Sequence, residues 1–180
     1  TKEHEDYKDF LKFKDQNVIN KNVDFIVLWN NRNIRRKLPG DVVLSMKQFV
    51  SKLPEEKRDN TLLVMKTQPI DDNGTDLIEV VKNCAPELNV LFFAERNDER
   101  HMNFIYNMAD VTINIASNEG FGLGTAESLM AGTPIVVNVT GGLQDQCGFR
   151  KEDGKLLTKE DYTTEWGSNH DGKYKDHGEW

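Results

Sequence analysis

Residues 111–142 read VTINIASNEGFGLGTAESLMAGTPIVVNVTGG, and the chain is organised around this segment. Val111–Ala116 is a β-branched run that is typical of a buried strand, and Ile135–Val139 predicts a second one. Between them, a glycine-rich turn leads into a short helix that we expect over Thr125–Ala131 and that ends at Gly132. A strand, a tight turn, a helix and a strand form one βαβ unit, whose two strands run parallel.

The turn of this unit has the features of a phosphate-binding site. Its glycines, Gly120, Gly122 and Gly124, allow a ligand to approach the backbone closely, and the start of a helix offers free N–H groups and a partial positive charge. Glu119 and Glu127 lie on either side of the turn, eight positions apart, so both are expected to face one pocket. Because two carboxylates beside a phosphate would repel it, we expect them to accept hydrogen bonds from sugar hydroxyls. The turn therefore predicts a site for a phosphorylated sugar.

The rest of the chain predicts three more strands and the helices that separate them. The expected strands are Asp24–Trp29, Thr61–Thr67 and Val90–Ala94, and the expected helices begin at an Asp41 cap or span Asp76–Asn83 and Glu99–Asn107. Strands that alternate with helices predict an α/β fold with a Rossmann-like, doubly wound parallel sheet. This domain is expected over residues 24–142, after an irregular lead-in segment (1–23) and before a polar irregular tail of the same domain (143–180).

Composition narrows the function classes. The chain has 23 basic and 30 acidic residues, which argues against a nucleic-acid or membrane surface. No apolar run approaches the roughly 20 residues of a transmembrane helix. Cys84 and Cys147 are far apart and unpatterned, which favours free thiols in a reducing, cytoplasmic location. Neither the cysteines nor the histidines have the spacing of a metal site.

The motif around the turn resembles that of a known enzyme family. The donor site of retaining GT-B glycosyltransferases (group 1, family-4 type) is similar to residues 117–142, SNEGFGLGTAESLMAGTPIVVNVTGG. The resemblance implies that the chain is a single GT-B half-domain, the carboxyl-terminal one that binds the donor. It also implies that Glu119 holds hydroxyls of the transferred sugar and Glu127 holds the nucleotide ribose. The backbone amides that would face the sugar and the diphosphate are those of Gly120, Phe121, Gly122 and Leu123.

A second part of the donor site is implied for the basic loop after the first strand, which reads NRNIRRK over residues 31–37. In the family, an arginine and a lysine of this loop bind the donor diphosphate, and Arg32 and Lys37 match these positions best. Arg35 or Arg36 remains an alternative to Lys37 in this role. On its own, the loop could equally be an ordinary solvated charged segment.

The function implied by the resemblance is transfer of a hexose from a nucleoside diphosphate sugar, UDP- or GDP-linked, to an unknown acceptor with retained anomeric configuration. The catalytic residues would be Arg32 and Lys37, which stabilise the departing diphosphate, and Glu119, which orients the sugar. No metal or other cofactor is implied. The acceptor would bind to an amino-terminal domain that is missing from these 180 residues, so we expect donor binding with little transfer.

Two other functions remain open on this fold, a nucleotide-sugar epimerase and a non-catalytic nucleotide-binding module. Isomerisation without an acceptor would mark the first, and binding without turnover the second. The role of Gly141 and Gly142, which follow the last expected strand, is also open. They are either a plain turn or part of the sugar pocket.

Overall fold

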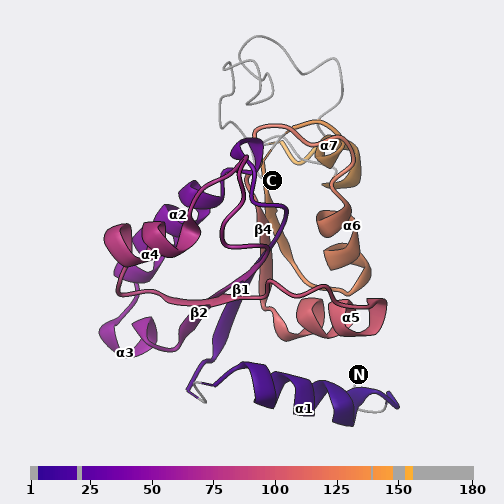
Figure 1. Cartoon of the computed structure of the whole chain (residues 1–180). Coiled ribbons are helices and arrows are strands. Elements are labelled where there is room, and N and C mark those ends of the chain that lie inside the picture. Colours follow the sequence, from indigo (N-terminus) through magenta and orange to yellow (C-terminus); the bar gives the residue numbers. More distant parts are fainter. Residues whose placement is uncertain (1–3, 20–21, 139, 148–152, 156–180) are drawn as a thin grey trace.

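The chain folds around one five-stranded β-sheet, in a computed structural model that describes residues 4–19, 22–138, 140–147 and 153–155 (Figure 1). The strands are β1 Phe25–Asn30, β2 Thr61–Lys66, β3 Asn89–Phe92, β4 Val111–Asn114 and β5 Ile135–Val137. Their order across the sheet is β3-β2-β1-β4-β5, and every neighbouring pair is parallel. The predicted α/β, doubly wound parallel sheet is therefore confirmed.

Helices cover both faces of this sheet (Figure 1). On one face lie α2 (Pro39–Ser51) and α4 (Leu77–Cys84). On the other face lie α5 (Glu99–Met108) and α6 (Leu123–Met130). An additional helix, α1 (Tyr7–Asn17), packs against α5. The short helices are the 3₁₀ helix η1 (Arg35–Lys37), α3 (Glu55–Arg58) and α7 (Leu143–Cys147).

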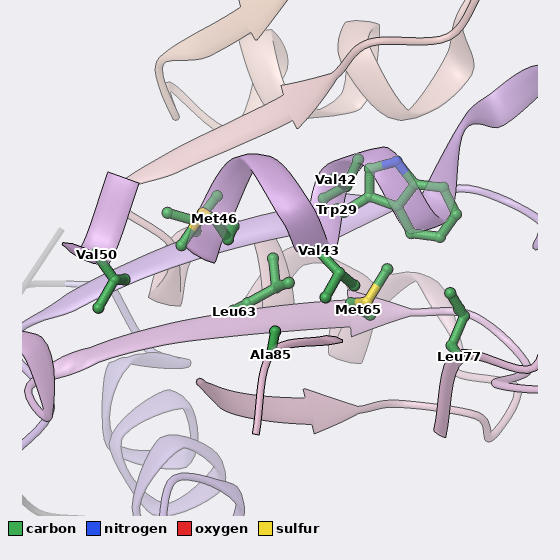
Figure 2. Close-up of a cluster of buried hydrophobic side chains, with 10 residues drawn as sticks. Trp29, Val42, Val43, Met46, Val50, Leu63, Met65, Leu77 and Ala85 are labelled. Atoms are coloured by element: carbon green, nitrogen blue, oxygen red, sulfur yellow. The ribbon is translucent and has the colours of Figure 1, made fainter. Parts of the chain in front are cut away.

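Successive side chains of the central strands point to opposite faces of the sheet, and this explains why helices cover both faces. Val27 and Trp29 of β1 belong to the apolar cluster under α2 and α4, where Figure 2 shows Trp29 beside α2. Ile26 and Leu28, the alternate residues, belong to a second cluster with α5. A strand that is buried on both faces has an almost continuous apolar sequence, and FIVLW in β1 is such a run.

The lead-in segment differs from the prediction. It was expected to be irregular, but it forms α1 and packs onto α5. The rings of Phe10 and Phe13 lie 5.9 and 5.7 Å from that of Phe104, measured between centroids. Arg100 of α5 adds an ion pair to Asp9 at 2.5 Å. The prediction was wrong because the apolar residues of α1 stand among charged ones, and their partner helix comes much later in the chain.

Two helix boundaries and part of the tail also differ. Leu38, with φ of 52°, precedes α2, and Pro39 occupies its first position, so Asp41 lies in the first turn and is not the cap. α6 begins two residues earlier than expected, at Leu123. Leu143–Cys147 forms α7, where an irregular tail was expected. The remaining tail residues 148–152 and 156–180 lie outside the described residues.

Candidate functional site

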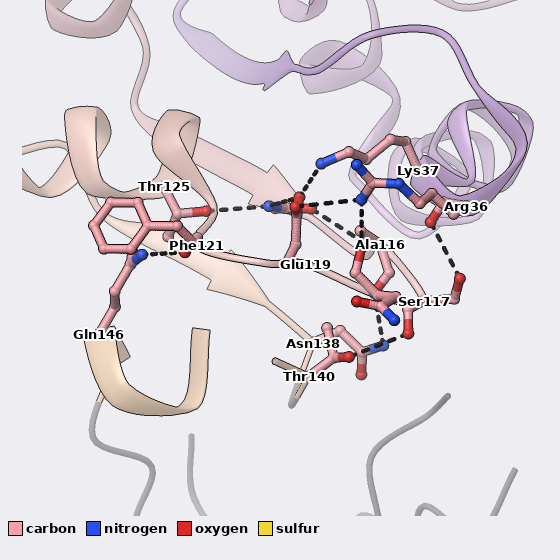
Figure 3. Close-up of polar contacts among 12 residues, drawn as sticks. Arg36, Lys37, Ala116, Ser117, Glu119, Phe121, Thr125, Asn138, Thr140 and Gln146 are labelled. Carbon is pink, nitrogen blue, oxygen red and sulfur yellow. Dashed lines mark hydrogen bonds and ion pairs between the residues drawn. The ribbon is translucent and has the colours of Figure 1, made fainter. Parts of the chain in front are cut away.

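The candidate site lies where the strand order changes direction, between β1 and β4. In such a sheet the loops after these two strands leave a crevice at the carboxyl edge. The basic loop follows β1, and the glycine-rich turn follows β4. The amide of Ser117 donates to the carbonyl of Arg36 at 2.9 Å, and the Arg36 guanidinium donates to the carbonyl of Asn118 at 2.6 Å (Figure 3). The fold thus joins two motifs that lie 82 positions apart in the sequence.

A buried ion pair lies between these loops. Lys37 Nζ donates to Glu119 Oε1, and the two side chains are 9% and 4% exposed. Arg36 Nη1 lies 3.5 Å from Glu119 Oε2, so two cations face one carboxylate. Burial lowers the pKa of Lys37, against the opposing effect of Glu119. The Lys37 ammonium therefore has little contact with water, and an additional anionic partner would stabilise its charged form.

Asn114, the last residue of β4, fixes the Glu119 carboxylate. Its Nδ2 donates to Glu119 Oε1 and to Thr125 Oγ1, both at 3.1 Å. Its Oδ1 accepts from the amide of Ala116 at 3.2 Å. Asn114 thereby connects the glutamate before the turn to the first turn of α6. Asn114 was not among the predicted site residues, although a polar residue within an otherwise β-branched strand was a usable signal.

The glycine-rich turn starts α6 and leaves donors free. Gly122 is the residue before α6 and has a φ of 83°, a left-handed conformation that glycine adopts without strain. Within the part of the chain that the structure describes, no acceptor is bonded to the backbone amides of residues 120–123. Free amides at a helix start carry a partial positive charge and suit an anion. The role predicted for the amides of Gly120, Phe121, Gly122 and Leu123 stays a prediction.

Gly141 and Gly142 pack directly against the backbone of the turn. The amide of Gly142 donates to the carbonyl oxygens of Glu119 at 3.2 Å and Gly120 at 3.1 Å. A Cβ on Gly141 would lie 1.7 Å from the Glu119 carbonyl oxygen, and one on Gly142 would lie 2.3 Å from that of Gly120. These two glycines therefore allow the loop after β5 to support the turn.

Glu127 lies at the wall of a cavity of about 460 Å³ between α5 and α6. The hydroxyl of Tyr106 donates to Glu127 Oε2 at 2.6 Å, and Asn30 Nδ2 donates to that hydroxyl at 2.6 Å. Met102 and Met130 supply apolar lining. A carboxylate beside apolar side chains suits a ligand that has both hydroxyls and a flat ring.

Arg32 lies apart from the Lys37–Glu119 pair. Its Nε donates to Asp71 Oδ2 at 2.9 Å, and 64% of its side chain is exposed. Asp71 belongs to the loop after β2. The structure thus brings Lys37 and the alternative cation Arg36 to Glu119, while Arg32 contacts a neighbouring loop.

A parallel α/β domain with a glycine-rich helix start and paired cations at its switch point is an arrangement that is common in nucleotide- and phosphate-binding domains. Residues 10–162 match the family model described as Glycosyl transferases group 1, and the chain therefore belongs to this family. The match confirms the resemblance to group 1 glycosyltransferases. A search of the curated proteins found no match to the chain.

Several solved structures share the fold. Sucrose-phosphate synthase from Thermosynechococcus elongatus is 26% identical over 82% of this chain, with a TM-score of 0.58. HepE from Anabaena, in complex with UDP and glucose, is 20% identical over 92%, with a TM-score of 0.61. WaaG, a glycosyltransferase involved in lipopolysaccharide biosynthesis, is 23% identical over 73%, with a TM-score of 0.58. The chain covers 35%, 41% and 33% of these proteins, respectively.

The described residues contain neither a metal-binding cluster nor a membrane-spanning helix. No group of three or more His, Cys, Asp or Glu side chains in them is placed to hold a metal ion. None of their helices is both long enough and apolar enough to cross a membrane.

Proposed function

We propose that this chain is the donor-binding half of a retaining GT-B glycosyltransferase, which transfers a hexose from a nucleoside diphosphate sugar to an acceptor. The observation that carries the proposal is the meeting of Lys37, Arg36 and Glu119 at the switch point of the sheet, beside free amides at the start of α6. Cations and N–H donors suit a diphosphate, and a carboxylate that accepts hydrogen bonds suits sugar hydroxyls. The arrangement therefore offers partners to the diphosphate and to the hexose, the two groups joined by the bond that breaks.

In this proposal the diphosphate binds between Lys37 and the amides of residues 120–123. These groups stabilise the charge that grows on the diphosphate as its bond to the sugar breaks. Glu119 exchanges part of its contact with Lys37 for hydrogen bonds from the hexose and so orients the ring. Arg36 is already at the site, whereas Arg32 can contribute only after it leaves Asp71. No metal ion takes part in the proposed step.

The nucleoside is proposed to occupy the cavity between α5 and α6, where Glu127 accepts from the ribose hydroxyls and the methionines contact the base. UDP is the first nucleotide to test, because HepE, which shares the fold, was solved with UDP and glucose and with UDP-glucose. The hexose itself is not selected by any residue described above.

A thermal-shift screen with UDP-, GDP- and ADP-sugars, followed by calorimetry, tests the proposal. We expect one nucleotide series to raise the melting temperature, with no change on adding EDTA. Lys37→Met should weaken the matching nucleoside diphosphate about tenfold or more and leave the free nucleoside unchanged, because it removes a charge-assisted contact. Lys82→Met, at an exposed pair with Glu79, is the matched control. Equal losses for the diphosphate and the nucleoside would contradict the proposal.

The acceptor site is proposed to lie on another domain, since the chain spans between about a third and two-fifths of the solved relatives. Closure between two domains excludes water from the reacting centre. These residues alone should therefore show saturable donor binding with transfer near background. Isomerisation of UDP-glucose without an acceptor would favour an epimerase instead.

A cytoplasmic location is also proposed, and the free thiols Cys84 and Cys147 fit it.

A further inference from the structure

We infer that Tyr106 is a positioning residue for the nucleotide ribose, because its hydroxyl fixes the carboxylate of Glu127 at the wall of the cavity between α5 and α6. The inference rests on the proposed function, in which Glu127 binds ribose hydroxyls. Tyr106 Oη donates to Glu127 Oε2 at 2.6 Å and accepts from Asn30 Nδ2 at 2.6 Å. Three elements, β1, α5 and α6, thus meet at one hydroxyl.

Chemistry sets the direction of both hydrogen bonds. Tyrosine has one hydroxyl proton, an ionised carboxylate only accepts, and an amide nitrogen only donates. The proton of Tyr106 is therefore directed to Glu127, and Asn30 supplies the second bond. Tyr106 is 2% exposed, and burial, together with the neighbouring Glu127, raises the pKa of its hydroxyl. The hydroxyl consequently keeps its proton and remains a donor.

Close packing makes this hydroxyl a fixed point. A Cβ on Gly124 would lie 2.9 Å from the Asn30 carbonyl oxygen and 3.5 Å from Tyr106 Oη, so the first turn of α6 approaches both groups closely. Beyond the end of α6, Thr133 Oγ1 donates to the Tyr106 carbonyl at 2.9 Å. Tyr106 is therefore held against both ends of α6, the helix that carries Glu127.

Glu127 needs such a support because its side chain is otherwise exposed. Among the described residues, its Oε2 is bonded to Tyr106, and its Oε1 has no hydrogen-bond partner. One oxygen is thus held while the other can accept from a ligand. Without the hydroxyl, Glu127 would sample several rotamers and would lose its directional preference for ribose hydroxyls.

The substitution Tyr106→Phe tests this inference, because it removes only the hydroxyl. Calorimetry on the full chain compares UDP with 2′,3′-dideoxy-UDP, which lacks both ribose hydroxyls. We expect Tyr106→Phe to weaken UDP about five- to tenfold and the dideoxy compound less than about twofold. In a Glu127→Ala background, Tyr106→Phe should cause no further loss, since it acts through that carboxylate. Tyr7→Phe in α1 is the matched control and should change neither ligand.

The possible outcomes separate the inference from the proposed function. If the hydroxyl has a merely structural role, Tyr106→Phe weakens both ligands alike, and the inference is overturned. If Glu127→Ala weakens UDP while Tyr106→Phe changes neither ligand, the inference alone is wrong. If Glu127→Ala leaves UDP binding unchanged, the ribose assignment in the proposed function is wrong as well. Should Tyr106→Phe not fold, Asn30→Ala replaces it in the same comparison. It should also weaken UDP more than the dideoxy compound, by a smaller factor, and an unchanged ratio of the two affinities overturns the inference.

Discussion

Replacing Glu119 with glutamine should destabilise the protein without weakening its binding of a bare nucleoside diphosphate. Glu119→Gln preserves the side-chain shape and the contact with Asn114 but removes the charge that faces Lys37. Breaking a buried pair costs about 3–5 kcal/mol, and the retained Asn114 contact favours the lower limit. At about 2–4 °C per kcal/mol for a domain of this size, a loss of about 3 kcal/mol lowers the melting temperature by roughly 6–12 °C.

Ligand affinity should respond differently in the same variant. Lys37 no longer has a competing carboxylate, so UDP should bind at least as tightly as it does to the wild type. UDP-glucose loses hydrogen bonds from its hexose to a charged group, each worth about 1.5–3 kcal/mol, so it should bind at least about tenfold more weakly. Urea unfolding measures the change in stability, and calorimetry with the two ligands measures the change in selectivity.

A matched control exists in an exposed ion pair on α4. Glu79 and Lys82 are 53% and 68% exposed, so Glu79→Gln should cost less than about 1 kcal/mol. A cost for Glu119→Gln no larger than that for Glu79→Gln would contradict a stabilising role of the buried pair. Equal weakening of UDP and UDP-glucose would contradict the role of Glu119 in binding the hexose.

Other substitutions test the roles of the basic side chains and of the glycines that support the turn. Arg36→Ala should weaken UDP binding about tenfold in calorimetry and Arg32→Ala should weaken it less, because of these two only Arg36 already contacts Glu119. The reverse order would favour Arg32 as the diphosphate-binding arginine, as the motif implies. Because burial lowers the pKa of Lys37, UDP affinity should begin to fall at a lower pH than the pKa of an ordinary lysine would set. Lys37→Arg, which stays protonated, should lose this alkaline decline in a titration of UDP affinity against pH. Gly141→Ala should cost about 2–3 kcal/mol in urea unfolding because its Cβ would overlap the Glu119 carbonyl. Gly40→Ala, where nothing lies within 4 Å of the added Cβ, should not destabilise, and equal losses would contradict the argument.

Local patterns in the sequence were sufficient to predict the sheet and the turn that precedes α6. The apolar run over Asp24–Trp29 indicated a strand, and the structure confirms one at Phe25–Asn30, which is buried on both faces. The glycine-rich segment indicated a turn before a helix, and Gly122 does take a positive φ there. Each of these features is a requirement that a few consecutive residues must satisfy, so a single stretch of sequence reveals it.

Helix α1 shows where local patterns were insufficient. Its apolar residues are few, and they form a helix because α5 offers a surface for Phe10 and Phe13. Tertiary packing of this kind stabilises short helices more than intrinsic propensity does. Composition alone therefore favoured an irregular segment.

Local patterns point to the two loops of the candidate site, whereas the side chains that meet there depend on the tertiary structure. Any arginine of the basic loop satisfies the same charge pattern, yet Arg36 reaches Glu119 and Arg32 contacts Asp71. Tyr106 reaches Glu127 because α5 and α6 lie on the same face of the sheet. The cause is the strand order. The crossover through α5 places β4 beside β1, and no local pattern encodes which residues this non-local pairing brings within hydrogen-bond distance.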